Sequence, residues 1–203
     1  MKVKNYSYLT AIWKIFPVLM MLLVANLGWG QYSGSGTFTK ITSISALTDG
    51  YYVIVNSGDT NAMNNNTTQV ANCLGYTGIT ANSIVNPSAT IVWKIETTAS
   101  GSTIFSENSS RYVSYTGSQN RVQVSETATT DNQRWSITYG TNEFLITNKA
   151  LTSRLLQFNN NSGQLRFACY TSSQQNILLY KLVPPANAAP TVSNVAISGL
   201  PNT

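Results

Sequence analysis

The residues that most often carry out catalysis are scarce in this chain. Among its 203 residues there is no His, and there are only seven Asp and Glu. A Ser-His-Asp triad, a Cys-His pair and a histidine metal site are therefore excluded. Seven carboxylates spread along the chain leave little room for the paired acids of a glycosidase. We expect no catalysis, no metal and no cofactor within these residues.

Two cysteines, Cys73 and Cys169, are the remaining candidates for covalent chemistry. In an oxidising compartment they could form one disulfide that closes a long loop. The alternative is two buried thiols that pack as small apolar groups. Without a His to activate it, neither thiol is expected to act as a nucleophile.

The first 30 residues have the pattern of a secretory signal peptide. Lys2 and Lys4 precede an apolar run over residues 15–27, and Gly28-Trp29-Gly30 supplies small residues before Gln31. The run is about 13 residues long, whereas a membrane-spanning helix needs roughly 20. An uncleaved membrane anchor is the alternative. We expect a secreted protein, extracellular or at the cell surface, without membrane contact after cleavage.

Cleavage would change the charge of the protein. Lys2, Lys4 and Lys14 would leave with the signal peptide, so that the twelve basic residues fall to nine against seven acidic residues, a net charge of +2. The nine are dispersed rather than clustered in sequence. Nucleic-acid binding is not expected, because it requires a concentrated basic patch.

Small uncharged polar residues dominate the rest of the chain. It contains 22 Asn, 23 Ser and 25 Thr, and these separate short β-rich runs between residues 38 and 182, where no helical periodicity is seen. We predict twelve strands. They are Tyr51–Val55, Asn61–Asn65, Ile79–Val85, Ile91–Ile95, Thr103–Ser106, Tyr112–Tyr115, Arg121–Val124, Arg134–Thr138, Glu143–Thr147, Arg154–Phe158, Leu165–Cys169 and Leu178–Leu182.

The twelve strands form three sets of four. Each set closes on a strand that carries a large aromatic residue, namely Trp93, Trp135 and Tyr180, at spacings of 42 and 45 residues. A repeat of about 40 residues indicates a structural repeat. Three four-stranded units favour an all-β fold, a β-trefoil with these aromatics in its core. A propeller needs more blades, and a β-sandwich with an accidental repeat is the alternative.

The segments on either side differ in composition from the repeats. Residues 31–37 are rich in Gly and Ser and are interpreted as a flexible lead-in. Residues 183–190 are rich in Pro and Ala and indicate a linker, after the β-trefoil over 38–182. Residues 191–203 are similar to the first strand of an immunoglobulin-like or fibronectin-like domain. The chain is therefore expected to be part of a longer protein, unless this tail is simply disordered.

The repeats resemble the ricin-type β-trefoils, which carry Gln-x-Trp at the end of each unit. Gln133-Arg134-Trp135 matches that triplet, and Trp93 and Tyr180 stand in the same position without the Gln. The chain also looks like β-trefoil modules found beside other domains in large secreted bacterial proteins. The resemblance implies one shallow sugar pocket per unit, formed by an Asp, a stacking aromatic residue and Asn or Gln.

At the position where an Asp is favoured, this sequence has Ser114 in the second unit and Gln157 in the third. The candidates that follow from the resemblance are uncharged amides and tyrosines. The alternative is that they are ordinary turn and strand residues. The candidate ligand-binding residues are Asn64, Asn65, Tyr76, Tyr115, Gln119, Asn120, Gln123, Gln157, Asn159, Asn160, Gln164 and Tyr170.

The sequence thus favours a non-catalytic secreted module that binds a neutral glycan or polysaccharide through shallow repeat pockets. The alternative is a structural or protein-interaction domain of a larger secreted enzyme. Its catalytic domain, a nuclease, peptidase or glycosidase, would lie beyond residue 203. Under either interpretation, other domains of the same chain are expected as partners.

Overall fold

A computed structural model describes residues 31–68, 72–80, 83–117, 119–171 and 173–183. The predicted signal peptide, most of the predicted linker and the predicted C-terminal strand lie outside the described residues. The described chain is built from β-strands and three short 3₁₀ turns, Ile44–Ala46, Ala89–Ile91 and Asp131–Gln133. No helix in these ranges has the length and apolar character needed to cross a membrane.

Six strands close into an antiparallel barrel. Each pairs with the next, and the last pairs back to the first, so the ring has no open edge. In ring order these strands are β2 (Gly50–Asn56), β6 (Val92–Thr98), β7 (Gly101–Ser106), β10 (Trp135–Gly140), β11 (Glu143–Asn148) and β14 (Ile177–Leu182).

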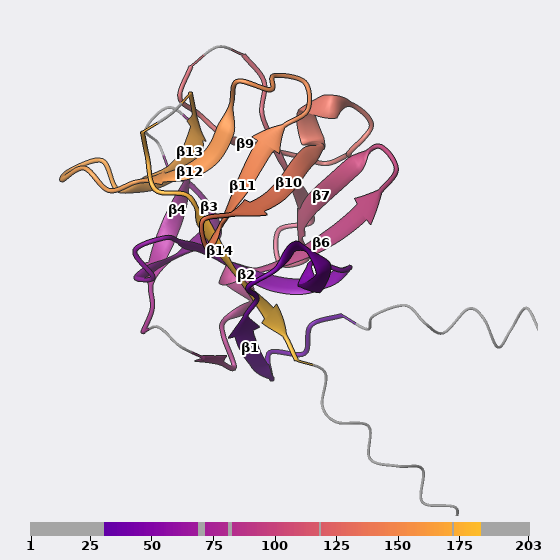
Figure 1. Ribbon diagram of the computed structural model, residues 1–203, viewed down its shortest axis with the longest axis vertical. Coiled ribbons are helices and arrows are strands. Elements are labelled where there is room, and N and C mark those ends of the chain that lie inside the picture. Colours follow the sequence, from indigo (N-terminus) through magenta and orange to yellow (C-terminus); the bar gives the residue numbers. More distant parts are fainter. Residues whose placement is uncertain (1–30, 69–71, 81–82, 118, 172, 184–203) are drawn as a thin grey trace, which may run out of the picture. The chain divides into compact units, whose positions relative to one another are not determined.

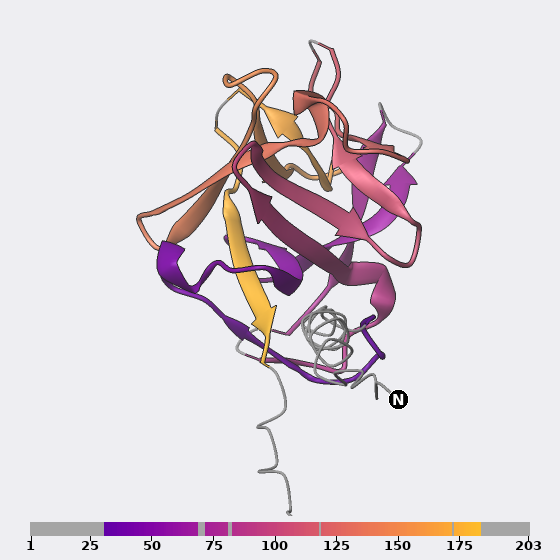
Figure 2. The same cartoon turned by 90° about the vertical axis from the view of Figure 1, so that its right-hand side faces the viewer.

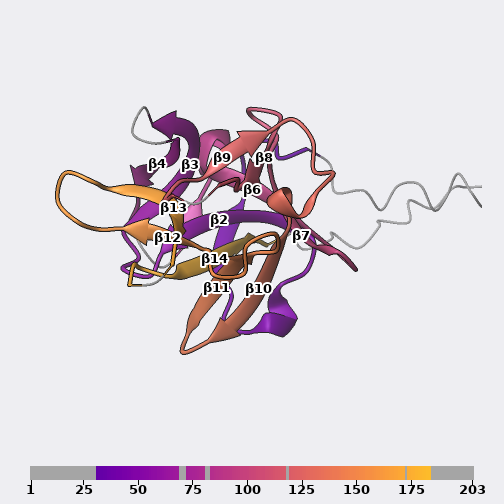
Figure 3. The ribbon, with the colours of Figure 1, turned by 90° about the horizontal axis from the view of Figure 1, so that it is seen from above.

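Three hairpins extend from the barrel, and Figure 3 shows them beside one another. Each hairpin connects two barrel strands, so that barrel strand, hairpin and barrel strand form one four-stranded unit. The three units predicted from the repeat are therefore present. The hairpins are β3 (Asn61–Thr68) with β4 (Cys73–Gly78), β8 (Arg111–Ser114) with β9 (Gln123–Ser125), and β12 (Leu155–Asn159) with β13 (Arg166–Tyr170).

Barrel and hairpins share one hydrophobic core. Trp93 and Trp135 are fully buried in it, and their indole N–H groups donate to the carbonyl oxygens of Met63 at 2.9 Å and Val113 at 3.2 Å. Each tryptophan therefore joins a closing barrel strand to the hairpin of its own unit. Burying an aromatic ring while satisfying its N–H is the arrangement expected for a core tryptophan.

In the third unit, the strand register places Ile177 at the position that Trp93 and Trp135 occupy in the other units. The sequence predicts Tyr180 at this position. Ile177 lies 42 residues after Trp135, the same spacing that separates Trp135 from Trp93. Tyr180 packs in a different cluster, and its hydroxyl donates to Asp59 at 2.6 Å. The equivalent facing pairs are Trp93 with Tyr52, Trp135 with Ser102, and Ile177 with Phe144.

Two strands outside the three units cover one side of the barrel. Strand β1 (Thr37–Lys40) pairs with β14, beside which it runs in Figure 2, and β5 (Ile84–Val85) pairs with β1. Between them and the barrel lies a second hydrophobic cluster around Phe38. Strand β2 is consequently buried on both faces along its whole length.

One predicted strand is wrong. The third strand of the first unit is Cys73–Gly78, and among the described residues of Ile79–Val85 only the last two are in a strand. The glycines of β4 weaken its β signal, and Gly75 lies close to a side chain of the neighbouring strand. A Cβ at Gly75 would lie 2.8 Å from Oδ1 of Asn64, so local packing outweighs the higher β propensity of the following segment.

Candidate functional site

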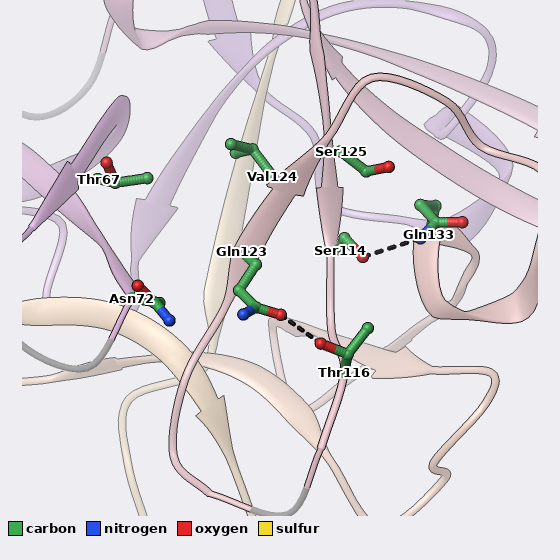
Figure 4. A pocket seen from close by; sticks show the side chains of 8 residues that line it. All are labelled: Thr67, Asn72, Ser114, Thr116, Gln123, Val124, Ser125 and Gln133. Carbon is green, nitrogen blue, oxygen red and sulfur yellow. Dashed lines mark hydrogen bonds between the residues drawn. The ribbon is translucent and has the colours of Figure 1, made fainter.

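A polar pocket of about 430 Å³ lies beside the hairpin of the second unit. Figure 4 shows the side chains that line it, which come from five parts of the chain. No charged residue contributes to its lining. The lining residues are Thr67 of β3, Asn72 before β4, Ser114 and Thr116 at the end of β8, Gln123, Val124 and Ser125 of β9, and Gln133 of the third 3₁₀ turn.

Gln133 of the Gln-x-Trp triplet forms the rigid side of the pocket. It is buried, its Nε2 donates to Oγ of Ser114 at 2.9 Å, and its Oε1 accepts from Oγ1 of Thr130 at 3.0 Å. The backbone N–H of Thr130 donates to the same Oε1, which forms a capping box for the turn. The Ser114 hydroxyl is therefore held in one position before any ligand arrives.

Gln123 forms the more accessible side. Its Oε1 accepts a hydrogen bond from Oγ1 of Thr116, and its Nε2 points the other way, toward Asn72 (Figure 4). An amide nitrogen held in this way can donate to a ligand oxygen. Together with the Ser114 hydroxyl, it makes the pocket a neutral set of donors and acceptors without nucleophile, acid or base.

Comparison with known proteins identifies the fold. No protein family and no curated protein matches the sequence. Among solved structures, the Polyporus squamosus lectin is 15% identical, with a TM-score of 0.54 over 66% of this chain and 50% of that lectin. The designed threefold-symmetric protein ThreeFoil is 16% identical, with a TM-score of 0.51 over 66% of this chain and all of that protein. The fold is a β-trefoil.

A third neighbour is a mosquitocidal holotoxin, 14% identical, with a TM-score of 0.54 over 70% of this chain and 18% of the toxin. The chain thus spans about half the length of the Polyporus lectin and a smaller part of the toxin. The lectin was solved with a bound saccharide epitope, Neu5Acα2-6Galβ1-4GlcNAc. At these identities, the likeness concerns the β-trefoil fold.

Of the residues predicted for the second trefoil unit, Gln123 alone contributes to the pocket. Tyr115 is fully buried, with its hydroxyl donating to the backbone oxygen of Gln119 at 3.1 Å, so it cannot stack on a ligand. The side chain of Gln119 accepts from Arg121 at 2.5 Å, and that of Asn120 accepts from Arg154 at 2.8 Å. These amides orient arginines outside the pocket.

In the third trefoil unit, the predicted amides bond within the protein. Gln157 is buried and its Nε2 donates to Oδ1 of Asn176 at 2.8 Å, while Oδ1 of buried Asn159 accepts from the backbone of Asn161 at 2.8 Å. The larger Gln157 stands where the second unit has Ser114. The remaining predicted residues of this unit are exposed Asn160, exposed Gln164 and buried Tyr170.

In the first trefoil unit, the predicted residues also form hydrogen bonds or packing contacts within the protein. Asn64 is buried and bonds within its own hairpin, and Nδ2 of Asn65 donates to Oγ of Ser106 at 3.1 Å. Tyr76 is partly exposed, and its ring packs edge-on against Phe158 with centroids 5.8 Å apart. Each of these three side chains thus has a partner of its own within the protein.

Several pocket residues were not predicted. Ser125 continues the strand of Gln123, and Thr116 follows Ser114 by two residues, so the alternation of β-strands could have suggested both. Val124 lies between Gln123 and Ser125 on the same strand. Thr67 and Asn72 come from the neighbouring trefoil unit, and no spacing within a single unit points to them. The unpredicted side chains are Thr67, Asn72, Thr116, Val124 and Ser125.

The two cysteines carry buried thiols. The Cys73 sulfur donates to the backbone oxygen of Asn120 at 3.7 Å. Burial raises the pKa of both thiols, and the charges of Arg166 and Arg121 only partly offset it at Cys73. Since the thiolate is the reactive form, neither cysteine is activated as a nucleophile. Of the two possibilities that the sequence leaves open, a disulfide or two buried thiols, the structure has the two free thiols.

Proposed function

We propose that this chain is a non-catalytic carbohydrate-binding module, exported from the cell, and that the pocket of the second trefoil unit holds a neutral sugar. The observation that carries the proposal is the fixed pair of Gln133 and Ser114 at the wall of an uncharged pocket. Sugar hydroxyls both donate and accept hydrogen bonds, and the hydroxyl and amide groups of the pocket can complement both roles.

The position of the pair strengthens the proposal. In the ricin-type family, which this chain resembles, a sugar-binding Asp is expected where Ser114 stands. A serine keeps the hydrogen bonding but not the charge, which favours a neutral ligand. The likeness in fold to a lectin crystallised with a saccharide supports a carbohydrate as the ligand.

The pocket size also fits a small ligand. A volume of about 430 Å³ lies at the lower end of the roughly 300–1,000 Å³ typical of ligand sites. We therefore expect one or two sugar rings to enter it. Hydroxyl and amide contacts without an aromatic platform predict modest affinity, in the micromolar to millimolar range.

The test begins with the purified 203-residue chain on an array of neutral oligosaccharides, followed by calorimetric titration of the glycans that bind. Gln123→Ala should weaken binding about tenfold, because it removes hydrogen bonds worth about 1–1.5 kcal/mol. Alanine suits the fold at this position, since Ala168 occupies the equivalent register in the third unit.

The control is Asn160→Ala, which removes an exposed amide from the hairpin of the third unit. It should bind like the unchanged chain. Equal affinity of the Gln123→Ala variant, or failure of the chain to bind any neutral glycan, would contradict the proposal. The second result would favour a spacer or protein-interaction role instead.

A further inference from the structure

The outward face of β4 and β13 carries a small cluster that the pocket does not use. The two strands pair antiparallel, with Phe167 opposite Leu74. Alternate residues of a strand point to opposite faces, so the residues of this pair divide into two sets. The inward set, in the main core, is Leu74, Phe167 and Cys169; the outward set is Cys73, Ala168 and Tyr170.

Two arginines border the outward set. Arg166 lies two residues before Ala168 on β13 and therefore shares its face. The backbone oxygen of Arg121 accepts from the N–H of Cys169 at 3.0 Å. The residue after Arg121 donates its N–H to the oxygen of Asn72 at 3.0 Å, directly before Cys73. Cys73 thus lies between the two arginines, in agreement with the lowering effect of both charges on its pKa.

Neutral amides hold these guanidinium groups. Arg121 donates to Oε1 of Gln119 at 2.5 Å, and Arg166 donates to Oε1 of Gln164 at 3.3 Å. An amide oxygen orients a guanidinium without cancelling its charge. Each arginine has five N–H donors. The Nε of both is buried, so an external group would have to meet the terminal N–H groups that the glutamines do not use.

The carboxylates of the protein are engaged elsewhere. Among the described residues, which include all seven Asp and Glu, no salt bridge joins a carboxylate to Arg121 or Arg166. Glu107, Glu143 and Asp49 accept hydrogen bonds from Tyr51, Asn176 and the backbone of Thr97. The four salt bridges are Lys40–Asp59, Lys94–Glu96, Arg111–Glu126 and Arg134–Asp131.

This basic face, defined by Arg121 and Arg166, adjoins the polar pocket. Arg121 lies two residues before Gln123, which lines the pocket, and Asn72 both lines the pocket and bonds to the residue after Arg121. A ligand in the pocket that extends past Asn72 would meet positive charge. Guanidinium groups recognise carboxylate and sulfate groups through paired hydrogen bonds.

We infer that the basic face formed by Arg121 and Arg166 binds the anionic group of an acidic glycan, a sulfate ester or a carboxylate, whose neutral part occupies the adjoining pocket. The inference rests on the proposed sugar-binding role of the pocket and narrows its ligand class. Binding should then have two separable parts, a neutral contact at Gln123 and a salt-sensitive contact at the arginines.

The experiment compares a sulfated galactan oligosaccharide with its desulfated form by calorimetry, at low and high salt. The chain should bind the sulfated form at least about tenfold more tightly at low salt, since charge-assisted hydrogen bonds exceed neutral ones. The double variant Arg121→Gln/Arg166→Gln should bind both forms equally. Arg111→Gln, which removes an arginine already paired with Glu126, should keep the preference.

A second comparison measures binding of polygalacturonate oligomers, which carry carboxylates, and of their uncharged methyl esters. Together with the sulfate comparison, it identifies which anionic group the protein prefers. The inference is overturned if the unchanged chain prefers neither anionic form, or if the double variant retains the preference. Thermal unfolding of each variant shows that the fold is intact.

The failure of the proposed function can be recognised separately with inorganic sulfate. At matched ionic strength, sulfate should stabilise the unchanged chain against unfolding more than it stabilises the double variant. If sulfate does so and no neutral glycan binds, the proposed sugar pocket is wrong while the anion site stands. If neutral glycans bind through Gln123 and anionic forms gain nothing, the anion site is wrong and the proposed function stands.

Discussion

At the scale of single residues, much of the unusual asparagine content is structural. Asn56, Ser106 and Asn148 end the first strand of the three trefoil units, and all three are buried. Oδ1 of Asn148 accepts from the backbone N–H groups of residues 150 and 151, each at 3.1 Å. Oδ1 of Asn56 does the same for residues 60 and 61. One short polar side chain per unit thus satisfies the tight loop that follows it.

Tyr52 provides a prediction about pH. It is fully buried, and its hydroxyl donates to the backbone oxygen of Thr48. Burial raises its pKa to about 12, against about 10 in the unfolded chain. Because the folded state holds this proton more tightly, the Tyr52 hydroxyl stabilises the folded state fully below pH 10. As the pH rises toward 12, this stabilisation is lost, and the free energy of unfolding falls by up to about 2–3 kcal/mol.

The free energy of unfolding should therefore fall more steeply between pH 10 and 12 in the unchanged chain than in Tyr52→Phe. Denaturant titrations at several pH values measure this slope. Tyr76→Phe, which alters a partly exposed tyrosine, should keep the slope of the unchanged chain. If Tyr52→Phe also keeps it, the buried hydroxyl is not the group responsible.

At the scale of strands, the alternation of apolar residues predicts most of the fold. Eleven of the twelve predicted strands overlap the strands of the trefoil units. The exception is Ile79–Val85, whose last two residues pair with β1 rather than in the hairpin. The observed strand contains Gly75, where an added Cβ would lie 2.8 Å from Oδ1 of Asn64. This close approach involves two strands and cannot be inferred from local propensity.

The two cysteines carry a prediction at the same scale. Cys169 points into the core and Cys73 points outward from the neighbouring strand. A disulfide requires the two Cβ atoms to point toward each other within about 4.5 Å, which side chains on opposite faces do not allow. Thiol titration should detect two thiols per chain after unfolding without reductant, and very slow reaction in the folded state.

The control for that titration is Cys73→Ala, which should release a single thiol on unfolding. A result of no thiols from the unchanged, unfolded chain would mean that a disulfide forms. The register of β4 against β13 would then have to differ from the one observed, and the outward set described above would not exist.

At the scale of the molecule, the candidate site was harder to predict than the fold. Within each unit, the sequence indicates turn amides, and most of these bond to their own hairpin. The pocket joins the second unit to Thr67 and Asn72 of the first. That contact arises from packing of the units around the pseudo-threefold axis. Gln123 was predicted as one of the amides that follow the strand of Ser114, and the structure places it opposite Ser114 on the next strand.

The whole molecule also depends on a layer outside the three units. Phe38 of β1 is fully buried between the barrel and Tyr32, whose ring meets it edge-on at 5.6 Å. Phe38→Ala should lower the free energy of unfolding by about 3–5 kcal/mol, as for other buried phenylalanines. Thr39→Ala, at an exposed position of the same strand, should change it by less than about 0.5 kcal/mol.

Urea unfolding of the two variants decides whether the outer layer belongs to the folding unit. If the twelve trefoil strands fold independently of β1, Phe38→Ala would lower the free energy of unfolding by less than about 1 kcal/mol. The Phe38 cluster would then unfold locally, without the rest of the protein. A large cost with a single cooperative transition would mean that both clusters form together. We expect the second outcome, since β2 and β14 each contribute side chains to the core on one face and to the Phe38 cluster on the other.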